Sequence, residues 1–183
     1  MTAKARRTSR VHRQQPTRAF SVPAGSNLRP IVLVDIDGTL ADVRHRLHHI
    51  RGEKKKNWKA FFEAMDLDRP IASTVAWVQS LAQYHDIIIT TGRPELYRKR
   101  TVAWLKKNDI PFTDLFMRRD GDHRPDYEMK EEVLQRWPKK RIQLVIEDRP
   151  PVCDMWLKHG IRCVLVESHE ANQMVNEIYR EKI

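Results

Sequence analysis

Short apolar runs alternate with longer amphipathic segments over most of the chain. The run IVLVD at residues 31–35 and the run IIITT at residues 87–91 are rich in β-branched side chains, which is typical of strands buried on both faces. Comparable runs at residues 114–117, 142–146 and 161–166 predict three further strands. Runs of this kind indicate a sheet whose two faces are both covered.

Helical periodicity fills the stretches between these runs. Proline stands at or just before the first turn of two of the helical segments, and Gly160 ends another. Strands that alternate with helices connect by right-handed crossovers and form a parallel sheet. We therefore expect an α/β fold, a Rossmann-like three-layer sandwich with a central parallel sheet. The predicted helices span residues 57–65, 71–84, 94–108, 126–137, 151–159 and 170–180.

Charge divides the chain into two parts. The formal net charge is +10, and residues 1–29 hold seven Lys and Arg residues and no acid. This stretch is rich in Arg, Ser, Thr and Pro without apolar periodicity, which predicts a disordered tail before a folded domain over residues 30–183. Three roles of the tail remain open: an arm on nucleic-acid phosphates, an organellar transit peptide, or a solvated extension without a function.

Composition argues against a membrane protein and against a disulfide framework. No apolar run approaches the roughly 20 residues that span a bilayer, so we expect no membrane partner. Cys153 and Cys163 lie in apolar surroundings. We expect both to be buried free thiols, as in a reducing compartment.

Charged and polar residues follow directly where three of the predicted strands end. Charge buried at the end of an apolar strand is costly unless it is paired or bound to a metal, and helix N-caps would explain one such ending but not three. The carboxyl ends of parallel strands meet at one edge of the sheet, so four acids would converge there. Oxygen ligands of this kind suit Mg²⁺. The endings are residues 35–39 (DIDGT), 91–93 (TGR) and 147–149 (EDR), and the acids are Asp35, Asp37, Glu147 and Asp148.

The DIDGT stretch resembles the DxDGT signature of the haloacid dehalogenase (HAD) superfamily, which implies the HAD-like fold. The resemblance implies that Asp35 is a nucleophile that forms an aspartyl-phosphate, and that Asp37 is the general acid and base. The chemistry agrees, because a carboxylate is ionised at neutral pH and needs no base to attack phosphorus. Asp37 can protonate the departing alkoxide and then deprotonate water, while Gly38 lets the backbone turn sharply.

Two further motifs of the superfamily have counterparts in this chain. Thr91 matches the Ser or Thr after the second strand, whose hydroxyl and neighbouring amides hold the transferring phosphoryl oxygens. Gly92 and Arg93 follow it, and a guanidinium suits phosphate binding. Lys130 matches the motif lysine on a downstream helix, which implies that it offsets the negative charge of the nucleophile and the phosphate.

The fourth motif is an acidic pair, matched by Glu147 and Asp148. With it, the resemblance implies Mg²⁺ held by Asp35, by Asp37 through its backbone carbonyl, and by Asp148 and Glu147. The usual pair is Asp-Asp, so Glu147 is longer by one methylene. Whether Glu147 would touch the metal directly or through water stays open.

Residues 31–167 more closely resemble the 3′-phosphatase domain of bacteriophage polynucleotide kinase-phosphatase and its standalone phage and bacterial relatives. Residues 119–126 (RDGDHRPD), Lys130, the EDR ending and the Met-Trp pair before Gly160 carry this resemblance. It implies that Arg46 contributes to the site, and that Asp126 orients Lys130 or a substrate-binding arginine from one turn away. No G-x-x-x-x-G-K-[ST] motif occurs in the chain, so we expect phosphate removal rather than phosphate addition.

A short insert over residues 41–70 stands where many members of the superfamily carry a large cap domain. A small cap leaves the site open to large substrates, and its cations with Trp58, Phe61 and Phe62 suit a nucleic-acid end. Alternatively, at least two of these rings form the core of the cap. Three histidines in the insert lack the partners of a typical zinc site, and we expect them to face solvent or phosphate. They are His45, His48 and His49.

These observations lead to one leading expectation and two alternatives. We expect a Mg²⁺-dependent phosphomonoester hydrolase that removes 3′-phosphates from nucleic-acid ends. The alternatives are a phosphatase for nucleotides or other small esters, and a non-catalytic HAD-fold protein that binds nucleic acid. The resemblance to phage and bacterial proteins implies a cytoplasmic protein, with organellar import through the basic tail as the alternative. No separate protein partner is predictable.

Overall fold

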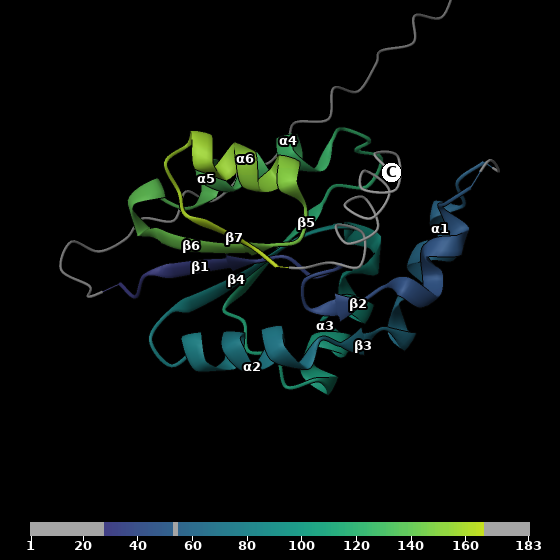
Figure 1. The fold of residues 1–183 in the computed structure, drawn as a ribbon, viewed down its shortest axis with the longest axis horizontal. Coiled ribbons are helices and arrows are strands. Elements are labelled where there is room, and N and C mark those ends of the chain that lie inside the picture. The colour runs from purple at the N-terminus through teal and green to yellow at the C-terminus, as the bar shows by residue number, and fades with distance from the viewer. Residues whose placement is uncertain (1–27, 53–54, 167–183) are drawn as a thin grey trace, which may run out of the picture.

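Five parallel strands form the central sheet in the computed structural model, which describes residues 28–52 and 55–166. The strand order is β5-β4-β1-β6-β7, so β1 lies in the middle, where all four of its residues are buried (Figure 1). The predicted Rossmann-like parallel sheet is confirmed. The strands are β1 (Ile31–Val34), β4 (Asp86–Pro94), β5 (Asp114–Arg118), β6 (Ile142–Glu147) and β7 (Cys163–Leu165).

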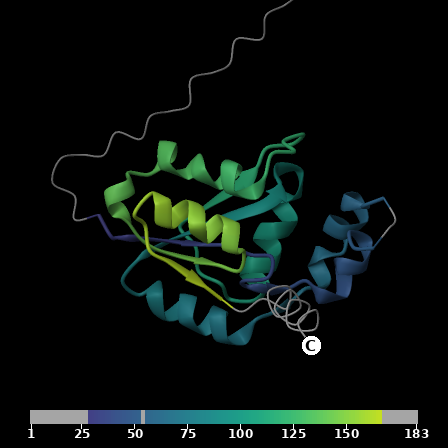
Figure 2. The same ribbon diagram turned by 45° about the horizontal axis from the view of Figure 1, so that its top comes forward.

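Helices cover both faces of this sheet (Figures 1 and 2). Val32 and Val34 pack with residues of α2 and α3 on one face, while Ile31 and Leu33 pack with residues of α5 and α6 on the other. This alternation follows from the period of two along a strand. None of the helices in the described ranges has the length and hydrophobicity needed to cross a membrane. They are α2 (Ala72–Leu81), α3 (Arg98–Lys107), α4 (Asp126–Glu131), α5 (Val133–Arg136) and α6 (Pro150–Lys158).

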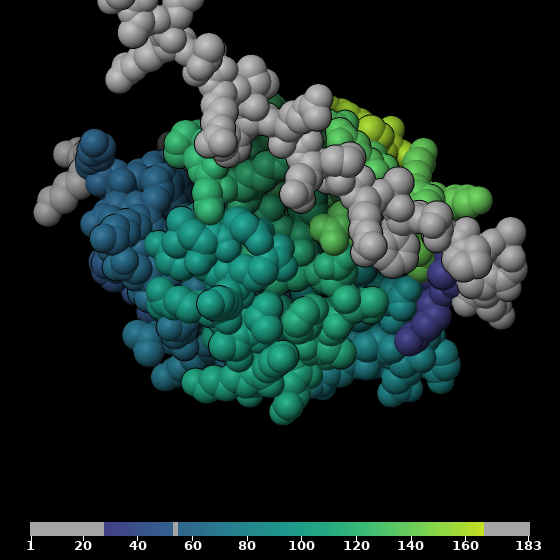
Figure 3. All heavy atoms as spheres, turned by 180° about the vertical axis from the view of Figure 1, so that it is seen from behind, coloured from purple at the N-terminus to yellow at the C-terminus, as the bar shows by residue number. Residues whose placement is uncertain are grey.

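The insert folds into a small cap segment at one end of the molecule, coloured blue in Figures 1 and 3. Its two short flanking strands pair with each other in antiparallel fashion. Arg100 of α3 donates to the carbonyl of Glu63 at 2.6 Å and to the Asp66 carboxylate at 2.7 Å, which fastens the cap to the core. The cap elements are β2 (Ala41–Asp42), the 3₁₀ helix η1 (Arg44–His49), α1 (Trp58–Glu63), the 3₁₀ helix η2 (Met65–Leu67) and β3 (Arg69–Pro70).

Several boundaries differ from the sequence prediction. The helix predicted over residues 126–137 is broken at Glu132, whose carboxylate accepts a hydrogen bond from Arg124 at 2.6 Å. The helix predicted over 94–108 begins only at Arg98, because β4 continues through Pro94 and a 3₁₀ turn follows. The predicted helix over 170–180 and nearly all of the predicted basic tail lie outside the described residues.

The expectation of two free thiols is wrong. Cys153 of α6 and Cys163 of β7 form a disulfide, with their Cα atoms 5.4 Å apart. The chain turns back after α6, where the amide of Ile161 donates to the carbonyl of Trp156. This turn brings the two cysteines to a separation that a disulfide bridges.

Candidate functional site

The carboxyl ends of β1 and β6 lie side by side because the two strands are direct neighbours in the sheet. Asp35 follows β1, and its amide donates to the carbonyl of Ile146 at 3.0 Å. Glu147 is the last residue of β6, and Asp148 comes directly after it. Acids that are far apart in the sequence therefore share one edge of the sheet, as the strand endings predict.

Asp35, Glu147 and Asp148 form a buried acidic cluster. One carboxylate oxygen from each lies within 4.8 Å of the others, and none of the three residues is more than 4% exposed. Asp148 Oδ1 is buried and has no hydrogen-bond partner among the residues that the structure describes. An unpaired buried carboxylate oxygen is costly, and three carboxylates are suitable ligands for a hard divalent cation, so the cluster could bind a metal.

Lys130 of α4 lies against this acidic cluster. Its Nζ donates to Asp35 Oδ1 at 2.7 Å and to Glu147 Oε2 at 2.6 Å, and Asp126 Oδ2 is 3.2 Å away. Burial disfavours the charged ammonium, but the attraction of Asp126, Asp35 and Glu147 outweighs it and holds the pKa of Lys130 well above its usual value. Lys130 therefore stays charged and offsets part of the negative charge.

Burial is the main influence that disfavours the ionised form of two carboxyl groups in the acidic cluster. Burial raises the pKa of Asp35 to about 8, and Glu147 and Asp126 add to an increase that Lys130 only partly opposes. Burial, followed by the charges of Asp35 and Glu147, raises the pKa of Asp148 to about 9. A divalent cation would reverse this balance, because it favours the ionised carboxylates.

Gly38 makes room for Asp148. A Cβ atom on Gly38 would lie 2.1 Å from Asp148 Oδ2, and the residue has φ of +96°. Both the space and the backbone conformation therefore require glycine here. The glycine of the DIDGT stretch thus serves the acidic cluster as well as the turn.

The two acids of the EDR ending are in different environments. Glu147 Oε2 is occupied by Lys130, and Oε1 faces the amides of Asp148 and Arg149 at 3.2 and 3.3 Å. Asp148 Oδ1 has no such partner within the described ranges. This difference favours Asp148 as the direct ligand, and direct ligation by Glu147 stays a prediction.

The Asp37 carboxylate is not part of the acidic cluster and contacts two arginines instead. Its Oδ1 accepts from Arg93 Nε at 2.8 Å and from Arg46 Nη2 at 2.8 Å. Burial alone would raise the pKa of Asp37, but Arg93 and Arg46 outweigh it and lower the pKa. The roles predicted for Asp37, as acid, as base and as a metal ligand through its backbone carbonyl, stay predictions.

Asp68 completes this group and was not predicted. Its fully buried carboxylate accepts from Arg46 Nε at 2.7 Å and Arg93 Nη2 at 2.8 Å, and it pairs with His45 Nε2 at 2.8 Å. No motif marks Asp68, although an acid near the end of a cation-rich insert is a weak indication of an ion pair. His45, expected to face solvent or phosphate, contacts this carboxylate. We call Asp37, Arg46, Asp68 and Arg93 the arginine cluster.

The remaining predicted residues lie at the same sheet edge. Thr91 is fully buried, and its Oγ1 accepts from the amide of Arg93 at 3.3 Å. A Cβ atom on Gly92 would lie 2.8 Å from Asp126 Oδ1, so glycine permits this close approach. Arg118, which was not predicted, donates to Asp126 Oδ1 at 2.9 Å and to the Gly92 carbonyl at 3.2 Å. Arg118 therefore fixes the loop beside Lys130.

The aromatic residues of the cap segment divide between core and surface. Phe61 is buried, and the guanidinium carbon of Arg46 lies 4.0 Å from its ring centroid. Phe62 is partly buried and packs against Tyr97, with ring centroids 5.5 Å apart. Trp58 is 48% exposed. The alternative that two of the three rings form the core of the cap is therefore confirmed.

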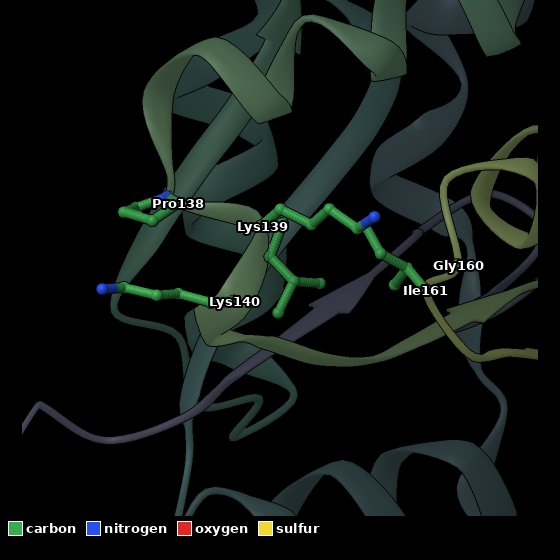
Figure 4. A pocket seen from close by; sticks show the side chains of 6 residues that line it. Pro138, Lys139, Lys140, Gly160 and Ile161 are labelled. Carbon is green, nitrogen blue, oxygen red and sulfur yellow. The ribbon is translucent and has the colours of Figure 1, made fainter.

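A shallow depression elsewhere on the molecule does not belong to this site. It is lined by Pro138, Lys139, Lys140, Gly160 and Ile161, with Ile142 at the start of β6 (Figure 4). The acidic cluster lies at the other end of that strand. The side chains in the depression include no carboxylate, so this surface lacks the chemistry of the acidic cluster.

Comparisons with known proteins agree with this geometry. Residues 29–170 match the family model of the polynucleotide kinase PNKP phosphatase domain. The protein "Putative bifunctional polynucleotide kinase/RNA ligase" of Autographa californica nuclear polyhedrosis virus is 30% identical over 142 residues, which cover 75% of this chain and 19% of that protein. This chain thus spans only a small part of its viral relative.

Solved structures establish the fold. A chain of the Pnkp1/Rnl/Hen1 RNA repair complex matches with a TM-score of 0.63 and 24% identity, over 84% of this chain and 47% of that one. A HAD family enzyme from Bacteroides thetaiotaomicron, in complex with magnesium and inorganic phosphate, matches with a TM-score of 0.50 and 14% identity, over 77% of this chain and 96% of that one. Taken with the family model, these matches identify the chain as a member of the polynucleotide kinase PNKP phosphatase domain family, within the HAD phosphatase superfamily.

Proposed function

We propose that this protein is a Mg²⁺-dependent polynucleotide 3′-phosphatase that forms an aspartyl-phosphate on Asp35. The observation that carries the proposal is the buried acidic cluster, in which Asp35 is hydrogen-bonded to the charged Lys130. Membership of the family supports a nucleic-acid substrate, and so do the names of the relatives, which refer to a polynucleotide kinase and to RNA repair.

In the first step, an oxygen of the Asp35 carboxylate attacks the phosphorus of the terminal phosphate. The bond from phosphorus to the sugar oxygen breaks, and the departing alkoxide takes a proton from Asp37. Lys130 holds Asp35 Oδ1 and offsets negative charge, while Thr91, Gly92 and Arg93 bind the phosphoryl oxygens.

In the second step, water attacks the phosphorus of the aspartyl-phosphate, and Asp37 takes its proton. The acyl-phosphate bond breaks, inorganic phosphate leaves and the Asp35 carboxylate is restored. Asp37 therefore needs a proton before the first step and must lose it there. Since Arg46 and Arg93 favour its ionised form in the structure, substrate binding has to loosen these contacts.

The acidic cluster would hold the cation through Asp35 and Asp148, with Glu147 beside them and the carbonyl of Asp37 as the ligand that the resemblance implies. When bound, Mg²⁺ supplies charge neutralisation for the phosphoryl group and for the acids around it. Within the described residues, Asp148 Oδ1 is a buried carboxylate oxygen without a hydrogen-bond partner, and a cation would supply one.

The cap segment determines how large a substrate can reach the site. Its described helices are short, and it exposes Trp58 together with Lys56, whose Nζ lies 5.8 Å from the Trp58 ring centroid. A cation beside an exposed ring suits a nucleobase and its phosphate. This combination favours a polynucleotide end over a small phosphate ester.

The test is phosphate release from an oligonucleotide with a 3′-phosphate, compared with a 5′-phosphorylated oligonucleotide and a 3′-mononucleotide. We expect Mg²⁺-dependent release that is fastest on the 3′-phosphorylated oligonucleotide and is abolished by EDTA. Asp35→Asn should lower the rate by at least about 10³-fold, because the nucleophile is lost.

The matched control is Asp154→Asn, which changes an exposed acid of α6 and should leave the rate unchanged. Full activity of Asp35→Asn would disprove the mechanism. Faster release from the mononucleotide would instead favour the small-ester phosphatase, and binding of oligonucleotides without any release would favour the non-catalytic alternative.

A further inference from the structure

The arginine cluster contains two carboxylates that share the same two guanidinium groups. Asp37 and Asp68 each accept from both Arg46 and Arg93, at distances from 2.5 to 2.8 Å. Arg46 comes from the cap segment and Arg93 from the end of β4. The cluster therefore joins cap and core at the point where the predicted phosphate-binding residues lie.

Exposure distinguishes the two carboxylates. The Asp37 side chain is 22% exposed, whereas that of Asp68 is 0% exposed. The backbone of Asp68 is also fixed, because its carbonyl accepts from Trp104 Nε1 at 2.9 Å. An incoming anion can therefore displace the Asp37 carboxylate from the arginines. It cannot displace the Asp68 carboxylate unless the cluster unfolds.

Arg93 also has unused donor capacity. Its Nη1 is buried and has no hydrogen-bond partner in the part of the chain that the structure describes. A buried guanidinium nitrogen without a partner is costly, and an oxygen of a bound phosphate would satisfy it. Arg93 can thus keep its bond to Asp68 while it takes up a new ligand.

We propose that Asp68 is the positioning residue that holds the guanidinium groups of Arg46 and Arg93 together as one binding site for the substrate phosphate. The Asp37 carboxylate occupies this site until substrate binds. The inference rests on the proposed function and adds two parts to it. Phosphate oxygens replace the Asp37 carboxylate on the two arginines, and Asp37 is released from both guanidinium groups. Asp68 stays in place and keeps the two guanidinium groups together.

The test compares Asp68→Asn with the wild-type full chain by titration with inorganic phosphate and with Mg²⁺. The amide has one acceptor oxygen instead of two and turns an NH₂ group toward cationic donors, so phosphate affinity should fall about 10-fold or more and KM should rise in parallel. Mg²⁺ affinity should stay unchanged, because the acidic cluster is intact. A general loss of structure would lower both affinities together.

Two further variants sharpen this comparison. Asp68→Glu restores the carboxylate and should recover part of the phosphate affinity. Glu63→Gln is the matched control, because Glu63 lies in the same cap segment but its exposed side chain pairs with Lys59 of the same helix, and phosphate binding should not change. If Asp68→Asn does not fold, His45→Ala takes its place, since His45 holds the same carboxylate from a partly exposed position. It should weaken phosphate binding by about 3-fold.

Phosphate affinity equal to the wild type in Asp68→Asn, or in His45→Ala where only that variant folds, would overturn the inference. The result can be separated from failure of the proposed function. A wild-type protein that binds phosphate but releases none from oligonucleotides would refute the function and leave the role of Asp68 testable by binding alone. A wild-type protein that releases phosphate from oligonucleotides but has no affinity for inorganic phosphate would refute the inference and leave the function standing.

Discussion

Gly38 and Asp148 depend on each other at the scale of single residues. The glycine lets the chain turn after β1, and the absence of a side chain leaves the space that the Asp148 carboxylate occupies. The DIDGT stretch and the EDR ending are therefore linked by steric fit as well as by shared chemistry.

Gly38→Ala should weaken Mg²⁺ binding and lower stability. The positive φ alone costs about 1–2 kcal/mol for alanine, and the new Cβ atom would push the Asp148 carboxylate from its place. Isothermal titration with Mg²⁺ and urea unfolding would measure the two effects.

Gly121→Ala separates these contributions. Gly121 also has a positive φ, of +77°, but a Cβ atom there would meet nothing within 4 Å. This control should show the backbone cost without a loss of Mg²⁺ affinity. Equal Mg²⁺ affinities in the two variants would mean that Gly38 does not protect the Asp148 site.

At the scale of elements, α3 supports the cap segment through the Trp104 indole as well as through Arg100. Trp104 Nε1 donates to the carbonyl of Asp68 at 2.9 Å, and its ring is buried. A helix of the core thus holds Asp68, which lies directly before β3 near the end of the cap segment.

Trp104→Phe should lower the free energy of unfolding by about 1–3 kcal/mol more than Trp156→Phe does. Both changes remove the same atoms from a buried indole. Only the first leaves a buried carbonyl without its donor, whereas Trp156 Nε1 has no hydrogen-bond partner within the described residues. Urea unfolding of both variants measures the difference, and equal losses would show that the Trp104 hydrogen bond contributes nothing.

The elements also show which parts of the fold a sequence can predict. The runs at 31–35 and 87–91 predicted β1 and β4, because strands buried on both faces need continuous apolar side chains. Within the cap, the helix predicted over residues 57–65 corresponds to α1 (Trp58–Glu63). The 3₁₀ helix η1 and the pairing of β2 with β3 were not predicted, since that pairing joins the two ends of the insert. The break at Glu132 and the disulfide likewise depend on residues that meet only after folding.

At the scale of the whole molecule, the strand endings predicted that Asp35, Glu147 and Asp148 would meet, because parallel strands bring their carboxyl ends to one edge. The Asp37 carboxylate, predicted to join them, contacts Arg46 and Arg93 instead.

Asp68 and Arg118 could not be predicted in this way. Asp68 lies in the cap segment, and Arg118, the last residue of β5, belongs to none of the quoted motifs. Only the packed structure shows that they hold Arg93 and Asp126.

Magnesium should stabilise the folded protein more at high pH than at low pH. The pKa of Asp35 is raised to about 8 and that of Asp148 to about 9, while the unfolded chain has values near 4. Between these values the folded, cation-free protein binds more protons than the unfolded chain, so its stability should fall as pH rises from about 4 to about 9.

Bound Mg²⁺ requires the ionised carboxylates and should remove this loss. The measurement is the midpoint of thermal unfolding at pH 6 and pH 8.5, with Mg²⁺ and with EDTA. The increase caused by Mg²⁺ should be larger at pH 8.5, and Asp35→Asn should reduce the difference. An increase that is the same at both pH values would contradict the assignment.

The contact between Lys130 and Asp35 spans 95 positions of the chain, and it has a consequence for how the protein folds. Contacts of such high sequence separation form late, after the loops between them have closed. A nascent chain that ends before β6 contains Asp35 but lacks Glu147 and Asp148, and so it has no cation site. Mg²⁺ should therefore slow unfolding of the folded protein without helping shorter fragments to fold. Binding of Mg²⁺ would then indicate that β6 has paired with β1.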